Sequence, residues 1–148
     1  MSKEIRESNR PIIAVGVLIF NSDNKILLGE RFSDFGKGMN ALPGGKVEKD
    51  EIFVKSAERE LFEETGLCGS VILFGKYISV AYENIFGLDG LTVGILARTE
   101  SEPKEIVGEG IGNWKWYDIE NLPENIFPPS KRIIDNYKCK KILFRQNR

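Results

Sequence analysis

The sequence predicts an α/β (α+β) fold in which a mixed β-sheet lies between helices. Three observations support this: an apolar, β-branched run at Ile12–Phe20, a helical stretch at 51–65, and a helix start at Pro128 after further strand-like segments. The 148 residues contain no internal repeat and no linker rich in Pro, Gly and Ser. A single domain over residues 1–148 is therefore expected.

The first predicted element is a hairpin. Ile12–Phe20 is nearly all apolar, which is typical of a strand buried on both faces. Asn21–Asn24 has the composition of a turn, and Lys25–Glu30 is expected to return as the partner strand. Residues 1–10 are polar and predict a frayed arm or an added edge strand. Residues 32–40 hold two glycines and polar side chains, which predicts an exposed loop.

The next element is a helix. Residues Glu51–Thr65 contain no glycine or proline, and Gly66 follows at the position of a helix C-cap glycine. Val54, Ala57 and Leu61 recur at helical spacing, so we expect them to face the core.

The second half predicts more strands. Val71–Tyr82 and Leu91–Ala97 are expected to form two of them, joined by a glycine-containing turn around Phe86–Gly90. Thr99–Gly112 is acidic and contains proline and glycines, which predicts a mobile loop, and Trp114–Tyr117 predicts a short aromatic strand.

The final predicted element is a helix. It begins at Pro128–Ser130 and continues to about Tyr137, because proline is tolerated in the first turn. The tail from Lys138 is basic around an apolar Ile142–Phe144 segment, and its structure is left open.

Composition narrows the function. Lys plus Arg total 21 against 22 for Asp plus Glu, so the net charge of −1 indicates no general affinity for nucleic acid or anionic membranes. The longest apolar run is far shorter than the roughly 20 residues of a membrane span, and no apolar secretion segment follows Met1. With only Cys68 and Cys139, the chain predicts neither a four-ligand zinc site nor a disulfide framework. A cytoplasmic location is expected.

The chain has no histidine. This excludes Ser-His-Asp and Cys-His catalysis and histidine-ligated zinc. An enzyme of this composition must work with carboxylates, lysines, tyrosines or a metal held by oxygen ligands.

A carboxylate cluster on the predicted helix is the strongest chemical signal. Glu60, Glu63 and Glu64 fall within about 100° of one another around the helix axis. Like charges at such spacing cost about 0.2–0.5 kcal/mol per pair. A hard cation such as Mg²⁺ would relieve this repulsion, because it prefers carboxylate oxygens.

The alternative is an ordinary solvated acidic face. Ion pairs such as Arg59–Glu63 would then balance its charge. That interpretation does not account for Gly44 and Gly45 shortly before the helix, where glycines permit a close backbone approach to a ligand.

Residues 45–67 read GKVEKDEIFVKSAERELFEETGL and resemble the signature of the Nudix hydrolases. That signature is Gly, five residues, Glu, seven residues, then Arg-Glu-aliphatic-any-Glu-Glu-any-Gly-aliphatic. The chain fills it at every position, with Gly45, Glu51, Arg59, Glu60, Leu61, Glu63, Glu64, Gly66 and Leu67. The resemblance implies a Nudix-type α/β/α sandwich and a hydrolase that cleaves diphosphate bonds.

The resemblance also implies roles for residues of this segment, the Nudix box. The metal, Mg²⁺ with Mn²⁺ as a substitute, would bind Glu60, Glu63, Glu64 and the backbone carbonyl of Gly44. Arg59 would orient the carboxylates, and either Glu60 or Glu63 would act as general base. Glu51 and Gly66 would be structural, and Gly45 would lie against the substrate.

For four residues outside the box, a functional role and a purely structural role are both open. Glu109 is expected to add an acidic group, with Glu105 as second choice, although an ordinary acidic loop would look the same. Arg31 is expected at a phosphate or in a surface ion pair. Trp114 and Trp116 would either stack on a base or belong to the core.

The substrate is least determined. Gly29–Arg31, Ala41–Gly45 and Trp114–Tyr117 most resemble the small MutT-like branch of the family, which favours hydrolysis of a nucleoside triphosphate, ordinary or modified, to monophosphate and pyrophosphate. The ADP-ribose hydrolases of the family that this chain resembles often carry a proline some fifteen residues past the box. The absence of proline between Pro43 and Pro103 therefore disfavours ADP-ribose.

Other substrate classes stay open. Tyr82 lies at the offset expected of dinucleoside-polyphosphate hydrolases, and nucleotide sugars are an alternative. A non-catalytic nucleotide-binding domain is disfavoured, because every glutamate of the box is present. The expected partner is a small nucleotide, and predicted edge strands are compatible with a homodimer.

Overall fold

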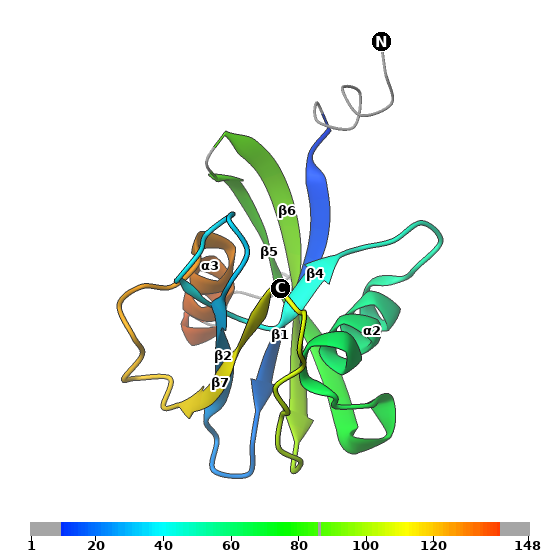
Figure 1. Cartoon of the computed structure of the whole chain (residues 1–148), viewed down its shortest axis with the longest axis vertical. Helices are drawn as coiled ribbons and strands as arrows, with labels where there is room; N and C mark the ends of the chain where they lie inside the picture. The colour runs from blue at the N-terminus through cyan, green and yellow to red at the C-terminus, as the bar shows by residue number, and fades with distance from the viewer. Residues whose placement is uncertain (1–9, 86, 140–148) are drawn as a thin grey trace, which may run out of the picture.

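The computed structural model describes residues 10–85 and 87–139. Its elements, shown in Figure 1, are β1 (Ile12–Phe20), β2 (Ile26–Arg31), β3 (Asn40–Ala41), β4 (Gly44–Lys46), α2 (Phe53–Thr65), a 3₁₀ turn (Gly69–Val71), β5 (Ile72–Ile85), β6 (Leu88–Thr99), β7 (Ile111–Tyr117) and α3 (Pro128–Lys138). The expectations for residues 1–9, for Phe86 and for the tail beyond Cys139 lie outside the described residues.

The strands form one mixed sheet, as the sequence predicted. Its main order is β3-β2-β1-β6-β5, with β4 paired to β1 and β7 paired to β2. β1 and β6 run parallel from Ile12 opposite Gly90 to Phe20 opposite Arg98, whereas the other pairs are antiparallel. β1 is therefore the centre of the sheet, which explains why its sequence is almost continuously apolar.

The two helices cover opposite faces of this sheet (Figure 1). Ala57 and Leu61 of α2 pack in one core cluster with Val17 of β1. Ile133 of α3 packs in the other cluster with Leu18, the next residue of β1. Because successive side chains of a strand point to opposite faces, β1 serves both cores and the α/β/α layering is confirmed.

Several elements are longer than their sequence pattern predicted. β5 and β6 continue to a tight hairpin in which Ile85 pairs with Leu88, where a broader turn was expected. β7 begins at Ile111, inside the predicted loop. In contrast, α2 is shorter than predicted, because it begins at Phe53 rather than Glu51. Backbone pairing between antiparallel strands needs no apolar pattern, so polar residues extend the hairpin.

None of the described helices is long and apolar enough to cross a membrane.

Candidate active site

The carboxylates of α2 lie against the short strand β4. The backbone N–H of Gly44 donates to Oε1 of Glu64 at 3.0 Å. A Cβ atom at Gly45 would collide with the Glu60 carboxylate, so the Glu60 side chain would have to move to admit any larger residue there. At the end of the helix Gly66 adopts a left-handed φ of 75° and its N–H donates to the carbonyl of Phe62, as predicted for a C-cap.

Arg59 connects the acidic side chains. Its guanidinium donates to both carboxylate oxygens of Glu51 at 2.6 and 3.0 Å, and to the Lys46 carbonyl at 2.9 Å. The same group donates to Glu60 at 2.7 Å and to Glu63 at 3.2 Å. A planar guanidinium can hold several carboxylates in fixed positions at once, which is the orienting geometry expected of Arg59.

Glu51 anchors Arg59 from the loop before α2. Its carboxylate also accepts a hydrogen bond from the Ser56 hydroxyl at 2.6 Å and from the Glu48 N–H at 2.9 Å. The hydrogen bonds from Arg59, Ser56 and Glu48 lower the pKa of Glu51 to about 2. Glu51 is thus fully engaged within the protein, which suits a structural role.

The surroundings of Glu60 and Glu64 disfavour the charged form of their carboxylates. Burial raises the pKa of Glu64 well above its usual value, although the hydrogen bond from the Gly44 N–H opposes this shift. The charges of Glu60 and Glu109 raise the pKa of Glu64 further. Burial also raises the pKa of Glu60, although Arg59 opposes this shift. The Glu63 side chain is the open member of the cluster, with 46% of its surface exposed. A cation shared by these groups would offset both the burial and the repulsion.

The carboxylates of Glu60, Glu63 and Glu64 are suitable ligands for a hard divalent cation, although in this structure they bind groups of the protein instead. Within residues 10–85 and 87–139, no three Asp, Glu or Cys side chains are gathered closely enough to hold an ion as they stand. The reason is visible in the contacts: Arg59 holds Glu60 and Glu63, while Glu64 accepts the Gly44 N–H. The cluster nonetheless consists of carboxylate oxygens, the ligands that Mg²⁺ and Mn²⁺ prefer.

The loop between β6 and β7 brings Glu109 to this cluster. The charge of Glu109 acts on both Glu60 and Glu64. The loop is anchored by the Lys104 N–H on the Thr65 carbonyl at 2.8 Å.

Glu105, the second choice on this loop, is used differently. Its two carboxylate oxygens accept the backbone N–H groups of Asn113 and Trp114 at 2.7 and 3.0 Å. Glu109, rather than Glu105, is therefore close enough for its charge to act on Glu60 and Glu64.

Both tryptophans of β7 lie with the core under α2. The Trp114 indole donates to the Glu64 carbonyl at 3.2 Å, and the Trp116 indole donates to Glu102 at 2.9 Å. Both rings are partly buried against the core cluster of that face. Neither lines the cleft described next, so the core alternative agrees with their position and stacking on a substrate stays a prediction.

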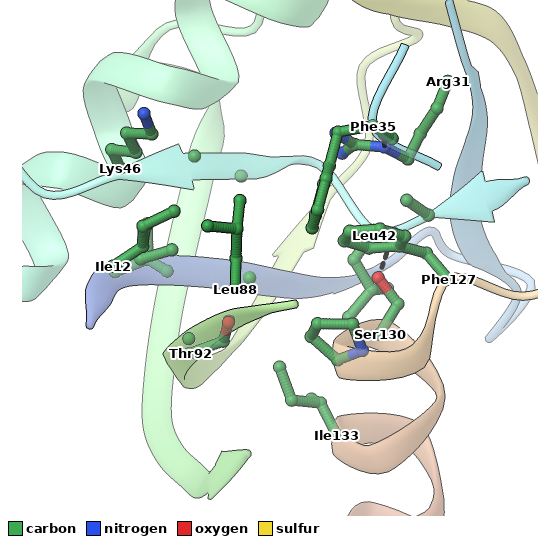
Figure 2. Close-up of a pocket in the computed structure, with 18 of the residues that line it drawn as sticks. Ile12, Arg31, Phe35, Leu42, Lys46, Leu88, Thr92, Phe127, Ser130 and Ile133 are labelled. Carbon is green, nitrogen blue, oxygen red and sulfur yellow. Dashed lines mark hydrogen bonds between the residues drawn. The ribbon is translucent and has the colours of Figure 1, made fainter. Parts of the chain in front are cut away.

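A cleft lies on the α3 side of β4, opposite the carboxylates. It encloses about 180 Å³. Figure 2 shows one wall that includes Ser130 and Ile133 of α3 together with Phe35, Leu42 and Phe127. Ile12, Leu88 and Thr92 form the other wall, and Arg31 and Lys46 lie at the rim. Gly44 and Gly45 border the cleft as well, so one short strand separates it from the acidic cluster.

Arg31 is held at this rim by the wall itself. It donates to the Phe35 carbonyl at 2.8 Å and to the Ser33 hydroxyl at 3.2 Å, and its guanidinium lies 4.2 Å from the centre of the Phe127 ring. Burial lowers the pKa of Arg31, and the charge of Glu64 opposes this shift. Phe35 and Phe127 were not predicted, because they are 92 positions apart (127 − 35) and no local pattern links them.

Fold and site together place a carboxylate helix against a double-glycine strand. With the family match and the relatives that follow, they define the class of protein as a hydrolase that acts on diphosphate bonds. The chain belongs to the Nudix family, since the family model described as NUDIX domain matches residues 10–137.

Known proteins agree with this assignment. An ADP-ribose pyrophosphatase of Methanocaldococcus jannaschii is 34% identical over 140 residues, which cover 93% of this chain and 80% of that protein. An RNA pyrophosphohydrolase of Pelagibacter ubique is 29% identical over 124 residues, covering 74% and 78%. The crystal structure of a MutT protein from Methanosarcina mazei has a TM-score of 0.78 at 22% identity, covers 89% of this chain and 96% of its own, and supports the fold.

Proposed function

We propose that this protein is a Mg²⁺-dependent hydrolase of a nucleoside-diphosphate-linked small molecule, with a nucleoside triphosphate as its preferred class. The observation that supports this proposal most directly is that β4 lies between the carboxylate cluster and the cleft. Carboxylates lie on one side of Gly44 and Gly45, and a cleft with two cationic side chains, Arg31 and Lys46, lies on the other. A diphosphate spanning this strand would meet acidic metal ligands and compensating positive charge together.

In this proposal the box residues divide the work. Glu60, Glu63 and Glu64, with the Gly44 carbonyl, would hold Mg²⁺, or Mn²⁺ in its place. When bound, such a cation neutralises phosphate charge and lowers the pKa of a water ligand. Arg59 and Glu51 keep the carboxylates in place, and Glu60 or Glu63 removes the proton from the attacking water.

Around the box, two charged side chains complete the site. Glu109 adds negative charge to the cluster. Arg31 is the proposed phosphate contact, because its guanidinium lies at the rim of the cleft and interacts electrostatically with Glu64.

The size of the cleft favours a substrate with one ring system. A volume of about 180 Å³ is below the roughly 300–1,000 Å³ that encloses a drug-sized ligand. Its aromatic and aliphatic walls suit the flat face of a single base. A nucleoside triphosphate places one base in the cleft and its phosphates at the rim, and the products would be monophosphate and pyrophosphate.

ADP-ribose is the second candidate. The relative from Methanocaldococcus jannaschii is named for this activity and spans most of the chain, so it weighs against the missing proline that disfavoured ADP-ribose. Nucleotide sugars and dinucleoside polyphosphates are further alternatives, and the relative from Pelagibacter ubique makes 5′-triphosphate RNA worth including.

A substrate screen tests the proposal. Purified protein with Mg²⁺ is given ordinary and oxidised nucleoside triphosphates, ADP-ribose, nucleotide sugars, dinucleoside polyphosphates and 5′-triphosphate RNA, and phosphate products are measured. Preference for a triphosphate supports the first candidate, and preference for ADP-ribose supports the second. Binding without turnover of any substrate contradicts the proposal and favours a nucleotide-binding domain.

A further inference from the structure

The two long walls of the cleft come from parts of the chain that are far apart. One wall is built by α3, through Pro129, Ser130 and Ile133. The other is built by the β5–β6 hairpin, through Leu88 and Gly90, and by Thr92 further along β6. Figure 2 shows Leu88 and Thr92 across the cleft from the helix. The width of the cleft therefore depends on how firmly the hairpin is held to α3.

One ion pair joins these two walls at the level of the cleft. Nε of Arg132 in α3 donates to Oε2 of Glu83 in β5 at 2.7 Å. Arg132 immediately precedes Ile133, and Glu83 pairs with Gly90 across the hairpin. Both residues of the pair are thus next to residues that line the cleft.

The pair lies near the outer end of the contact between α3 and β5. One helical turn further along α3, Asn136 donates to the Ser79 hydroxyl at 2.9 Å, four positions before Glu83. Beyond Glu83, the hydrogen bond between Asn84 and Asp89 joins the two hairpin strands to each other and adds no tie to the helix. The Glu83 carboxylate is mostly shielded, with 19% of its side chain exposed, whereas Arg132 is 57% exposed.

We propose that Glu83 and Arg132 are positioning residues whose ion pair sets the width of the cleft and so selects the organic group that the enzyme accepts. This inference rests on the proposed function, in which the cleft holds the base. Without the pair, the hairpin end that carries Leu88 moves more freely relative to α3. A single base is then held less well, while a bulkier group enters more easily.

Kinetics of four variants test the inference. Glu83→Gln and Arg132→Gln each remove the pair, and the double variant Glu83→Arg with Arg132→Glu restores it in reverse. Lys131→Gln is the matched control, because it breaks the ion pair of Lys131 and Asp135 on the same helix, 2.8 Å long and exposed, without touching β5. It also leaves in place the charge of Asp135, which acts on Arg132. Each protein is assayed with a nucleoside triphosphate and with ADP-ribose.

We expect each single variant to raise KM for the triphosphate by about two- to fivefold, the range for a partly exposed ion pair, with kcat nearly unchanged. The ratio of kcat/KM for ADP-ribose over the triphosphate should rise, and the reversed pair should return both values toward the wild type. The inference is overturned if the single variants match the wild type, if Lys131→Gln has the same effect, or if the reversed pair recovers nothing.

Amide hydrogen exchange tests the same contact without a substrate. In Glu83→Gln we expect the amides of residues 82–85 and 87–92 to exchange about two- to fivefold faster than in the wild type, with no such change in Lys131→Gln. Unchanged exchange overturns the inference. A wild-type protein that turns over no substrate contradicts the proposed function, while the exchange rates still decide whether the ion pair holds the hairpin.

Discussion

At the scale of single residues, Arg59 decides how the acidic side chains are arranged. It contacts Glu51, Glu60 and Glu63 at once, and its anchor Glu51 is itself held by two more donors. Glu63 has the most exposed carboxylate of the three proposed metal ligands on α2, so its replacement removes a ligand with little effect on packing.

Glu63→Gln should lower kcat by about 10²–10⁴-fold with the fold intact, because the amide can neither carry the negative charge nor accept the proton. The measurement is steady-state turnover at saturating Mg²⁺, with circular dichroism as the check on folding. Near-normal turnover in a folded variant would remove Glu63 from the proposed metal site.

Glu109→Gln should slow turnover more modestly, by about tenfold, because Glu109 acts on Glu60 and Glu64 through its charge. Glu105→Gln is the informative comparison, since that side chain holds the backbone of Asn113 and Trp114 instead. We expect Glu105→Gln to lower the melting temperature, and Glu109→Gln to leave it nearly unchanged. If Glu109→Gln turns over as fast as the wild type at saturating Mg²⁺, Glu109 has no role in catalysis and is simply a residue of an acidic loop.

At the scale of elements, the junction between β4 and α2 is the critical part of the structure. The Gly44 N–H donates to Glu64, and the missing side chain at Gly45 leaves room for the Glu60 carboxylate. Glu51 holds the start of the helix through Ser56 and Arg59. The acidic helix is therefore set in place by neutral glycines on one side and by an ion pair on the other.

This junction should make stability depend on acid pH. The pKa of Glu51 is lowered from 4.5 to about 2, so its contribution is fully present above about 4.5 and is lost as pH falls toward 2. Glu51→Gln should lower the melting temperature at pH 7 and reduce its fall between these pH values. Thermal unfolding in EDTA measures this, with Glu58→Gln as control, because the ion pair of Glu58 with Lys55 is longer and exposed. Parallel melting curves for Glu51→Gln and the wild type across this range would contradict the role of Glu51.

At the scale of the whole molecule, the sheet with a helix on each face places the acidic cluster and the cleft on opposite sides of one strand. The acidic cluster belongs to the α2 side, the cleft belongs to the α3 side, and β4 lies between them. A cation bound at the cluster would connect α2 to β4 through the proposed ligands, the carboxylates of the helix and the carbonyl of Gly44. Because it would bind only the folded arrangement of these elements, it should stabilise the folded protein.

Metal removal tests this. EDTA should abolish turnover, and Ca²⁺ should inhibit it, because Ca²⁺ is larger and its geometry is looser. At about 100 times its dissociation constant, Mg²⁺ should stabilise the fold by about 2.7 kcal/mol and raise the melting temperature by several degrees. The double variant Glu60→Gln with Glu64→Gln should show no such rise. Full activity in EDTA, after dialysis against chelator, contradicts the metal assignment.

The sequence by itself determined the parts that depend on local order. The helix of the box, its C-cap at Gly66, the β1–β2 hairpin and the start of α3 follow from side-chain periodicity and from glycine and proline chemistry. The spacing of Glu60, Glu63 and Glu64 on one helix also required no tertiary information, since a helix repeats every 3.6 residues.

Only the tertiary structure decided which distant residues meet. The approach of Glu109 to the box, the placement of Trp114 in the core, the pairing of Phe35 with Phe127 and the contact of Glu83 with Arg132 join segments far apart in the chain. Such contacts depend on strand register and on how each helix docks, and a local pattern contains neither. That is why the grouping of the carboxylates on one helix could be predicted from the sequence, whereas the cleft on the other side of β4 could not.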